Sequence, residues 1–383
     1  MSRKIKLVHA VSRLGMGGME NGIVNICNGL NRDLFAPAVF CLKEGGAMES
    51  RLSPDVKVKV FNYKEGCHPM RWISLMRELK KEKIDIIHAH GWGQGSFEFV
   101  IAAKAAGVPV VINGEHGLFF LKSIQVWLQR FISGLCDATL TVGNALKIET
   151  IEKLKIDPAR IIAVCNGVDI DRFHGRYDNL LIKNRLAERY KIGFSGDDLI
   201  VGCLGSLKPV KNQIMVLKAA EKIKNKDLNI KFLLIGEGPD RGYLEEFIKN
   251  NGLSNDVFLL GQIDDVPEML SLMDLIVCPS ISEGFPNAIL EAFSSGVPVI
   301  AARSPGTEEL VIDGENGFII EQNDAERLSG LCESLSGNRA PLKKMALKAR
   351  GLIENSFSIR VMVEKYEALY SAMLRKKNIV MKG

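Results

Sequence analysis

Short apolar segments alternate with longer amphipathic ones along almost the whole chain, and this alternation restricts the fold more than any other feature. In the first half, the apolar runs are 5–10, 37–42, 56–61, 84–89, 108–113, 137–142 and 161–164. Several are continuously rich in Val, Ile and Leu, as expected of parallel strands that are covered by helices on both faces. Intervening segments such as 70–82 and 97–106 have helical spacing. This half therefore predicts a doubly wound α/β domain.

The alternation restarts in the second half, after a polar stretch with several turn residues at 172–198. The new apolar runs are 199–204, 230–235, 256–260, 274–279, 297–302 and 317–320. A length of 383 residues suits two domains rather than a single core. We therefore expect two tandem Rossmann-like domains over 1–180 and 190–355, connected through the polar stretch, and a helical tail over 340–377.

Charge, cysteine content and hydropathy exclude several classes of protein. The net charge is only +5, which does not by itself point to nucleic acid as a partner. The eight cysteines are scattered without a C-x-x-C pair, which argues for reduced thiols rather than disulfides or a zinc knuckle. The first apolar strand is too short for a signal peptide, and no run reaches the ~18 apolar residues of a membrane span. We expect a cytoplasmic protein, either soluble or peripheral at the inner face of the cell membrane.

Glycine-rich turns follow several predicted strands, at the end of the sheet where doubly wound folds bind ligands. Two turns resemble the start of a dinucleotide-binding fingerprint but lack its last glycine. Glu20 takes that place in the turn that begins at Gly15, and Arg241 takes it in the turn that begins at Gly236. No G-x-x-x-x-G-K-[ST] motif is present. The turns therefore support neither a dehydrogenase nor a phosphate-loop NTPase.

The turn SISEGFPN at 280–287 follows a predicted strand and leads into a predicted helix. Pro286 suits the first helical position, and the N–H groups of the first turn would then form an anion site strengthened by the helix dipole. Gly284 permits a ligand to approach the backbone closely, and Glu283 lies beside it. This turn therefore predicts a phosphate site that needs no metal ion.

Two further charged residues complete the predicted site. Glu291 lies about one and a half turns into the helix, where a carboxylate can accept a pair of hydrogen bonds from sugar hydroxyls. Lys211 follows the first strand of the same domain and can place a cation opposite the phosphate. The three charged residues together predict a phosphorylated sugar as ligand.

These motifs resemble those of the retaining glycosyltransferases of family four, which have the GT-B fold, and the resemblance covers nearly the whole chain. Its most specific piece is the E-x7-E pattern EGFPNAILE at 283–291. The accompanying motifs are GGMENG near the N-terminus, HAHG at 88–91, NGEHG at 113–117, NGVDIDRF at 166–173 and PGTEELVIDGENGFII at 305–320. The resemblance implies two doubly wound domains that face a cleft, with a C-terminal segment, 356–383, that returns to the first domain. The motifs GGMENG and NGEHG look most like those of bacterial exopolysaccharide transferases.

The resemblance also implies a role for individual residues. Glu283 is expected to contact the donor sugar, Lys211 to stabilise the departing diphosphate, and His116 to face the donor sugar from the first domain. Glu291 is expected to hold the nucleotide ribose. Backbone groups that approach the sugar donor closely are expected at Gly17, Gly18, Gly284, Phe285, Pro286, Asn287 and Ala288.

One position departs from the family pattern. Many relatives have arginine where this chain has Ser206, which removes one of two cations from the diphosphate site. Lys208, Arg13 and Arg303 are the candidates to replace it.

The reaction that the resemblance implies is transfer of a sugar from a nucleotide-diphosphate-sugar to a glycan or lipid-linked acceptor, with retention at the anomeric carbon. We expect an oxocarbenium-like transition state, with the leaving phosphate taking the acceptor proton. Neither a cofactor nor a metal ion is expected.

Some interpretations stay open. His88 and His90 lie two apart at a strand end without a nearby third ligand, so structural histidines are favoured over a zinc site. The sequence DID at 169–171 fits a turn better than a metal-binding motif. The segment 118–135 mixes aromatic and basic residues and suits membrane-surface contact and a core helix equally well.

Two other functions also fit these features. A sugar-nucleotide epimerase of the same two-domain shape would change the sugar without an acceptor. A catalytically silent nucleotide-sugar-binding subunit would bind the sugar donor and transfer nothing.

Overall fold

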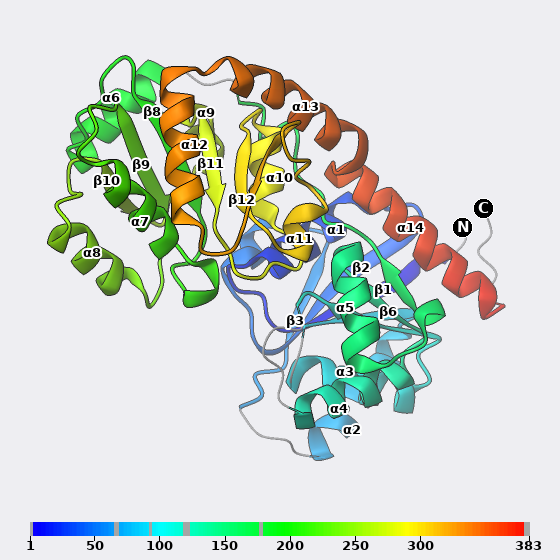
Figure 1. Ribbon diagram of the computed structural model, residues 1–383. Helices are drawn as coiled ribbons and strands as arrows, with labels where there is room; N and C mark the ends of the chain where they lie inside the picture. Colours follow the sequence, from blue (N-terminus) through cyan, green and yellow to red (C-terminus); the bar gives the residue numbers. More distant parts are fainter. Residues whose placement is uncertain (1–2, 65–68, 92–93, 118–122, 176–178, 379–383) are drawn as a thin grey trace. The chain divides into compact units, whose positions relative to one another are not determined.

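The computed structural model describes residues 3–64, 69–91, 94–117, 123–175 and 179–378 (Figure 1). The chain divides into two units, and each is described by itself. Unit 1 contains Met1–Gly167 and Ile359–Gly383, and unit 2 contains Val168–Ser358. No disulfide joins any of the seven cysteines within the described residues. No helix in the described part of the chain combines the length and apolar character needed to cross a bilayer.

Unit 1 is built on a parallel sheet of seven strands in the order β3-β2-β1-β4-β5-β6-β7. The strands are β1 (Ile5–Arg13), β2 (Phe35–Glu44), β3 (Lys57–Val60), β4 (Ile86–His90), β5 (Val110–Glu115), β6 (Ala138–Thr141) and β7 (Ile161–Ala163). The strand order reverses between β1 and β4, which pair directly. Such a reversal point is where parallel sheets of this kind bind their ligands.

Helices cover both faces of this sheet (Figure 1). Successive strand residues point to opposite faces, so that Val8 packs with helices α2 and α3, while Leu7 packs with α14. Tyr370 and Leu374 of α14 are fully buried in the second of these cores. The helices of unit 1 are α1 (Gly18–Gly29), α2 (Pro69–Glu82), α3 (Gln94–Ala106), α4 (Ser123–Leu135), α5 (Asn144–Leu154) and α14 (Ile359–Lys376), with short 3-10 turns η1 (Ala47–Arg51) and η2 (Pro158–Arg160).

Unit 2 repeats this plan with a six-stranded parallel sheet in the order β10-β9-β8-β11-β12-β13. Its strands are β8 (Leu199–Leu204), β9 (Ile230–Ile235), β10 (Val257–Gly261), β11 (Leu275–Cys278), β12 (Val299–Ala302) and β13 (Gly317–Ile320). Its helices are α6 (Asn179–Tyr190), α7 (Ile214–Ile223), α8 (Arg241–Asn250), α9 (Val266–Leu272), α10 (Asn287–Ser294), α11 (Pro305–Glu308), α12 (Ala325–Gly337) and α13 (Ala340–Ser356), with a 3-10 turn η3 (Pro209–Lys211). Here the strand order reverses between β8 and β11.

The structure confirms the predicted α/β fold of two doubly wound sheets, and each predicted strand is present. The structure differs from the prediction over 172–198, because this segment contains a helix and is not only a polar connection between domains. Helix α6 forms there and packs on α9, because Ile182 and Leu186 make a short buried stripe on a mostly polar helix. The predicted tail helix is interrupted at Phe357 and Ser358, and a bridge between Ser358 and Val168 ends unit 2 there.

Candidate functional site

An ion pair lies where the strand order of unit 2 reverses. Lys211 ends the 3-10 turn that follows β8, and Glu283 lies in the loop after β11. The Lys211 Nζ atom donates to Glu283 Oε1 at 2.6 Å, and the two side chains are only 28% and 13% exposed. Burial alone lowers the pKa of Lys211, but the Glu283 carboxylate outweighs it and holds that pKa above its usual range. The lysine therefore stays charged at neutral pH, beside a carboxylate and at the ligand-binding end of the sheet.

Glycines bring the loops after β8 and β9 into direct backbone contact. Gly205 and Gly236 both have φ in the left-handed half of the map, at +147° and +144°. A Cβ on Gly236 would lie 2.0 Å from the Gly205 carbonyl oxygen, and one on Gly238 would lie 2.2 Å from that of Leu207. The incomplete dinucleotide fingerprint at Gly236 is thus explained by packing between two loops, which supports the backbone beside Lys211.

The predicted start of the helix after Glu283 is shifted by one residue. Pro286 is the N-cap of α10 rather than its first helical residue, with φ −77° and ψ 103°, and Asn287 begins the helix. Proline has no side-chain oxygen that could accept a hydrogen bond from the first-turn amides. Gly284, Phe285 and Pro286 are buried, with Phe285 packed on Phe357, which fixes the path of the loop.

The remaining predicted residues of this helix are partly buried. Asn287, Ala288 and Glu291 all have this intermediate exposure, and Glu291 lies in the second turn of α10, within unit 2 like Glu283 and Lys211.

Gly306 supports the same loop and was not singled out from the sequence. It lies in α11, whose start is held by a capping box between Ser304 and Thr307. A Cβ at Gly306 would lie 2.3 Å from the Glu283 carbonyl oxygen and 3.0 Å from that of Gly284. The signal in the sequence was the PGTEE motif, which the family pattern includes without indicating this contact.

Ser206 lies in the loop after β8 and is partly buried, and its carbonyl oxygen accepts from Gln213 Nε2 at 3.0 Å. Among the candidate replacements for the missing cation, Arg303 forms ion pairs with Glu308 and Glu321. Arg13 lies in unit 1, 3.4 Å from Glu44. Lys208 is exposed and lies two residues from Ser206 in the same loop.

In unit 1, Gly17 and Gly18 lie where α1 begins, directly after the loop that follows β1. Gly17 is the N-cap, in an extended conformation, and a Cβ there would lie 2.3 Å from Glu20 Oε2. Burial raises the pKa of the Glu20 carboxyl, an effect that its own backbone N–H and Arg13 partly offset. The two glycines therefore lie where the sequence predicted them, at the carboxyl ends of the strands of unit 1.

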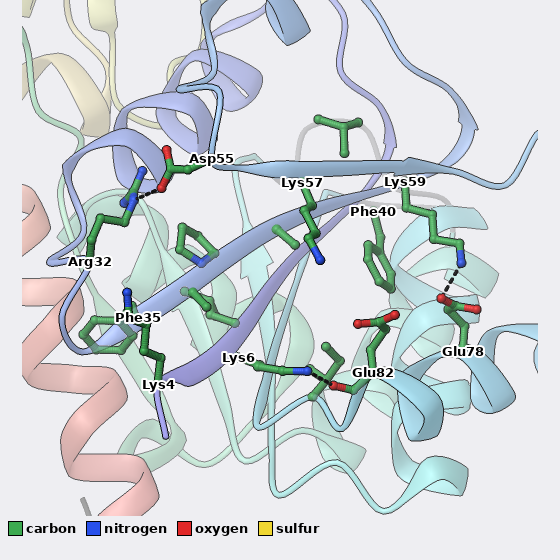
Figure 2. Close-up of a pocket in the computed structure, with 16 residues that line it drawn as sticks. Lys4, Lys6, Arg32, Phe35, Phe40, Asp55, Lys57, Lys59, Glu78 and Glu82 are labelled. Carbon is green, nitrogen blue, oxygen red and sulfur yellow. Dashed lines mark hydrogen bonds and ion pairs between the residues drawn. The ribbon is translucent and has the colours of Figure 1, made fainter. Parts of the chain in front are cut away.

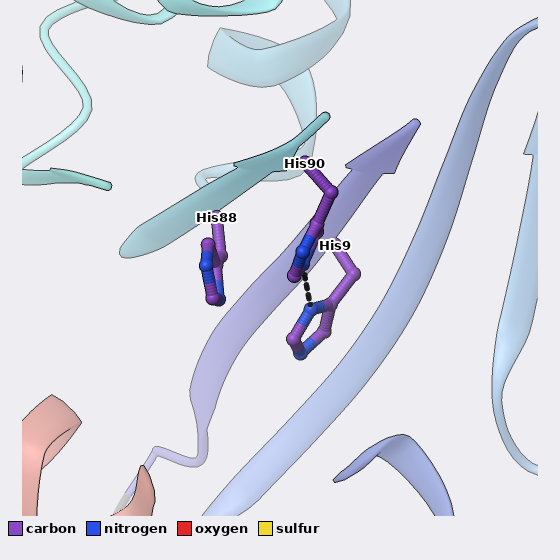
Figure 3. Close-up of side chains that lie close together, drawn as sticks. All are labelled: His9, His88 and His90. Atoms are coloured by element: carbon purple, nitrogen blue, oxygen red, sulfur yellow. Dashed lines mark hydrogen bonds between the residues drawn. The ribbon is translucent and has the colours of Figure 1, made fainter. Parts of the chain in front are cut away.

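His116 follows β5 and joins a group of imidazoles at the point where the strand order reverses. Its Nε2 atom lies 3.1 Å from Nδ1 of His90, and His90 Nε2 lies 2.7 Å from Nδ1 of His9. Figure 3 shows His9 on β1 facing His88 and His90 on β4. Burial lowers the pKa of His116 to about 4 and that of His9 to about 3, so that both imidazoles are neutral at pH 7.

The expectation that His88 and His90 lack a nearby third ligand is wrong, because the sheet register places His9 beside them. Ring nitrogens of His9, His88 and His90 all lie within 4.8 Å of one another. The His9–His90 separation of 2.7 Å is a hydrogen-bond distance, and no carboxylate among the described residues joins the group to neutralise a divalent ion. As it stands, the arrangement suits hydrogen bonding between neutral rings.

Glu115, next to His116, is a second residue that the sequence did not single out. It is 1% exposed, and its Oε1 accepts from Asn113 Nδ2 at 2.7 Å. Ser96 in turn donates to Asn113 Oδ1 at 2.8 Å. Burial raises the pKa of the Glu115 carboxyl to about 7, against a smaller opposite effect of Asn113. The NGEHG motif that marked His116 also contains this residue.

A hollow of about 580 Å³ in unit 1 lies away from all these residues (Figure 2). Lys6 and Ala36 line it from the starts of β1 and β2, at the amino ends of the strands. Two of its ion pairs join lining residues, Arg32 with Asp55 and Lys59 with Glu78 (Figure 2). The hollow therefore lies at the end of the sheet opposite to the candidate site.

Comparison with known families agrees with the fold. Residues 16–172 match the family described as Glycosyltransferase Family 4, and residues 184–351 match Glycosyl transferases group 1. A UDP-Gal:alpha-D-GlcNAc-diphosphoundecaprenol alpha-1,3-galactosyltransferase of Escherichia coli is 30% identical over 98% of both chains. The putative glycosyltransferase EpsF of Bacillus subtilis is 25% identical over 88% of both.

Solved structures show the same fold at lower identity. A glycosyltransferase from Rickettsia africae superposes with a TM-score of 0.84 at 21% identity, over 98% of this chain and 100% of that one. Anabaena Alr3699/HepE in complex with UDP superposes with a TM-score of 0.82 at 20% identity, over 97% and 100%. The protein is therefore a glycosyltransferase with two Rossmann-like domains of the GT-B type, and it belongs to glycosyltransferase family 4.

Proposed function

We propose that the protein transfers a sugar from a UDP-sugar to a glycan that is linked to a lipid diphosphate, with retention at the anomeric carbon and without a metal ion. The relative of 30% identity is named for a UDP-sugar and a diphosphoundecaprenol-linked acceptor, which supports this choice of substrates. The relatives of the EpsF type support a place in the synthesis of bacterial polysaccharide or cell-surface glycan.

The observation that carries the proposal is the Lys211–Glu283 pair, in which Glu283 belongs to the loop that leads into α10. In the reaction, the bond between the anomeric carbon and the β-phosphate oxygen breaks, and a bond from the acceptor oxygen to that carbon forms. The diphosphate gains negative charge as it leaves, and Lys211 stabilises that charge in this proposal. The ion pair with Glu283, which keeps the lysine charged, supports this role. The acceptor proton passes to the departing phosphate. A metal ion is not needed for charge balance where lysine and helix amides serve.

Other residues take supporting roles in this proposal. Glu283 shares its carboxylate between Lys211 and hydroxyls of the donor sugar, and Glu291 accepts from the ribose hydroxyls. His116 contacts the sugar from unit 1. Lys208 replaces the cation that Ser206 lacks, because it is the exposed lysine of the same loop.

We also propose that α4 contacts the membrane that holds the acceptor. Ile124, Trp127 and Phe131 are 63%, 60% and 44% exposed on one side of the helix, and the rings of Trp127 and Phe131 stack at 5.9 Å. Arg130 is exposed beside them, whereas Ile132 is buried in the core of unit 1. An apolar stripe next to a cation suits the surface of an anionic bilayer. Residues 118–122 of the predicted segment lie outside the described residues.

The proposed reaction is tested by replacing Lys211. Lys211→Ala should lower kcat by about 100- to 1,000-fold, as is typical when one preorganised charge partner of a leaving group is lost. Lys218→Ala, on the exposed side of α7, is the matched control and should leave kcat unchanged. Transfer from a panel of UDP-, GDP- and ADP-sugars should be measured with and without EDTA.

Near-normal turnover of the Lys211→Ala variant, or strict dependence on magnesium or manganese, would contradict the proposal. Formation of an epimer from the sugar donor alone would favour the epimerase instead. Binding without turnover of any sugar donor would favour the silent subunit.

A further inference from the structure

Three imidazoles form a continuous hydrogen-bonded chain inside unit 1. It runs from His9 on β1 through His90 on β4 to His116 after β5, with the distances of 2.7 and 3.1 Å given above. His9 and His90 are 0% and 4% exposed, and His116 is partly exposed at the end of the chain. The buried end of this chain is His9, which lies within the sheet. Its partly exposed end is His116, the residue that we assign to the sugar substrate.

The sheet register and one glycine create the space for this chain. His9 pairs with His88 across β1 and β4, and His90 pairs with Gly114 across β4 and β5. A Cβ on Gly114 would lie 3.1 Å from His90 Nδ1 and 2.8 Å from His88 Nε2. Any other residue would press on both rings. His116 is two residues beyond Gly114, so that it extends the same face of the sheet.

The chain can carry its protons in only two ways. Burial holds the pKa of all three imidazoles well below the usual range, so each ring carries one N–H and one lone pair. His90 is bonded through both nitrogens, and therefore it donates on one side and accepts on the other. If His90 donates to His116, then His116 has its proton on Nδ1; if it accepts from His116, the proton is on Nε2.

The buried end favours the first arrangement. His9 Nε2 has no hydrogen-bond partner among the described residues. If His9 accepted from His90, a buried N–H would be left at Nε2 without an acceptor among the described residues, whereas donation from His9 leaves only a lone pair there. Orphaned buried N–H groups are rarer than orphaned acceptors. The protons therefore run from His9 to His90 to His116.

We propose that His90 is a positioning residue that holds His116 in the Nδ1–H tautomer, so that His116 presents a hydrogen-bond donor to an oxygen of the sugar substrate. This inference rests on the proposed function for the placement of His116 at the substrate. The tautomer itself is a property of the free protein and can be measured without turnover.

The tautomer is read from ¹⁵N-histidine NMR at neutral pH. The whole protein has six histidines, and His116 is assigned from the signals that disappear in His116→Asn. We expect a protonated Nδ1 and an unprotonated Nε2 at His116 in the unchanged protein. His90→Leu should move the proton to Nε2, while His90→Asn, whose amide can donate from a similar place, should restore Nδ1–H.

His88→Asn is the matched control. His88 lies in the same cluster but is bonded through Nδ1 to Tyr370 Oη at 2.9 Å rather than to the chain. The control should leave the His116 tautomer unchanged even if it lowers stability. An Nε2–H tautomer in the unchanged protein, an effect of His88→Asn equal to that of His90→Leu, or one equivalent of zinc binding to His90 would each overturn the proposal.

Kinetics test the consequence for the reaction. His90→Leu should lower kcat about tenfold with a change in sugar-donor KM below about twofold, since one transition-state hydrogen bond is lost, and His90→Asn should recover most of it. Unchanged kcat in a His90→Leu variant with a shifted tautomer would overturn the inference. If the protein transfers no sugar at all, the proposed function fails separately, and the NMR result still decides whether His90 sets the tautomer.

Discussion

At the scale of single residues, the candidate site depends on groups whose charge is fixed by their immediate neighbours. Lys211 is held charged by Glu283, and the imidazoles of unit 1 are held neutral by burial. Glu115 is the opposite case, a buried carboxyl whose charged form meets no cation among the described residues. Its Oε2 atom has no hydrogen-bond partner among the described residues. The folded protein therefore favours the protonated form of Glu115.

The preference of the folded protein for protonated Glu115 makes the free energy of unfolding depend on pH. Because the pKa of Glu115 is raised from 4.5 to about 7 on folding, its contribution to stability is greatest below pH 4.5 and is lost as the pH rises to about 7. At 1.36 kcal/mol per pH unit, the loss is about 3 kcal/mol. Glu115→Gln should remove this loss, and it should be more stable than the unchanged protein at pH 8 but not at pH 4.5.

Urea unfolding across this pH range measures the difference. Glu152→Gln, an exposed change on α5 with the same loss of charge, is the control and should follow the unchanged protein at each pH. A Glu115→Gln curve parallel to that of the unchanged protein would show that the carboxyl is not protonated in the fold.

At the scale of elements, the loop after β11 is shaped by the short helix that packs against it. Gly306→Ala places a methyl group 2.3 Å from the Glu283 carbonyl oxygen, so the loop has to move. We expect KM for the sugar donor to rise by about tenfold, the effect of about 1.4 kcal/mol, with the fold retained. Gly330→Ala in α12 meets nothing within 4 Å and is the control, with an expected gain of about 1 kcal/mol in stability.

Sugar-donor affinity by calorimetry, together with thermal unfolding, separates the two variants. Equal loss of affinity in both, or none in Gly306→Ala, would show that α11 does not shape the loop.

The exposed side of helix α4 can be tested for contact with a membrane. Trp127→Glu with Phe131→Glu should abolish sedimentation with vesicles of anionic phospholipid, because two exposed rings are replaced by charges that the bilayer repels. Transfer to a water-soluble acceptor should persist, since these side chains point away from the core. Leu180→Glu and Leu181→Glu, both exposed on α6 of unit 2, form the control. Vesicle binding that survives in the α4 variant would remove this helix from the membrane contact.

At the scale of the whole molecule, unit 1 is assembled from two distant parts of the chain. Tyr370 of α14 is fully buried against β1 and β4 strands and bonded to His88. Tyr370→Ala should destabilise unit 1 by about 3–5 kcal/mol through the cavity it leaves. Hydrogen exchange should accelerate in unit 1 peptides and stay unchanged in unit 2. Tyr243→Ala, 57% exposed on α8, is the control, and equal acceleration in both units would contradict the division.

Much of the fold and part of the site could be predicted from the sequence. Strands such as Ile230–Ile235 were predicted because a buried parallel strand needs an unbroken apolar run, whatever its partners. Helix α6 was missed because, among its residues of described exposure, only Ile182 and Leu186 are buried. The joint placement of Lys211 and Glu283 at one reversal of strand order follows from topology, and so it was predictable.

Contacts that depend on packing between loops could not be predicted. Gly306 beneath Glu283 and the neighbours of His116 are brought together by strands and turns far apart in the chain. The spacing of residues along the sequence does not indicate these contacts. His9 in particular looked like an ordinary strand residue until the register placed it opposite His88.

The return of α14 to unit 1 also sets the order in which the newly synthesised protein can mature. The ribosome releases β1 through β7 long before residues 359–376, so that the part of one sheet face that α14 covers stays exposed while the whole of unit 2 is still being made. Apolar surface that is exposed in a partly made protein promotes aggregation. Mutations in the last helix should therefore reduce the yield of folded protein more than their effect on the finished molecule suggests.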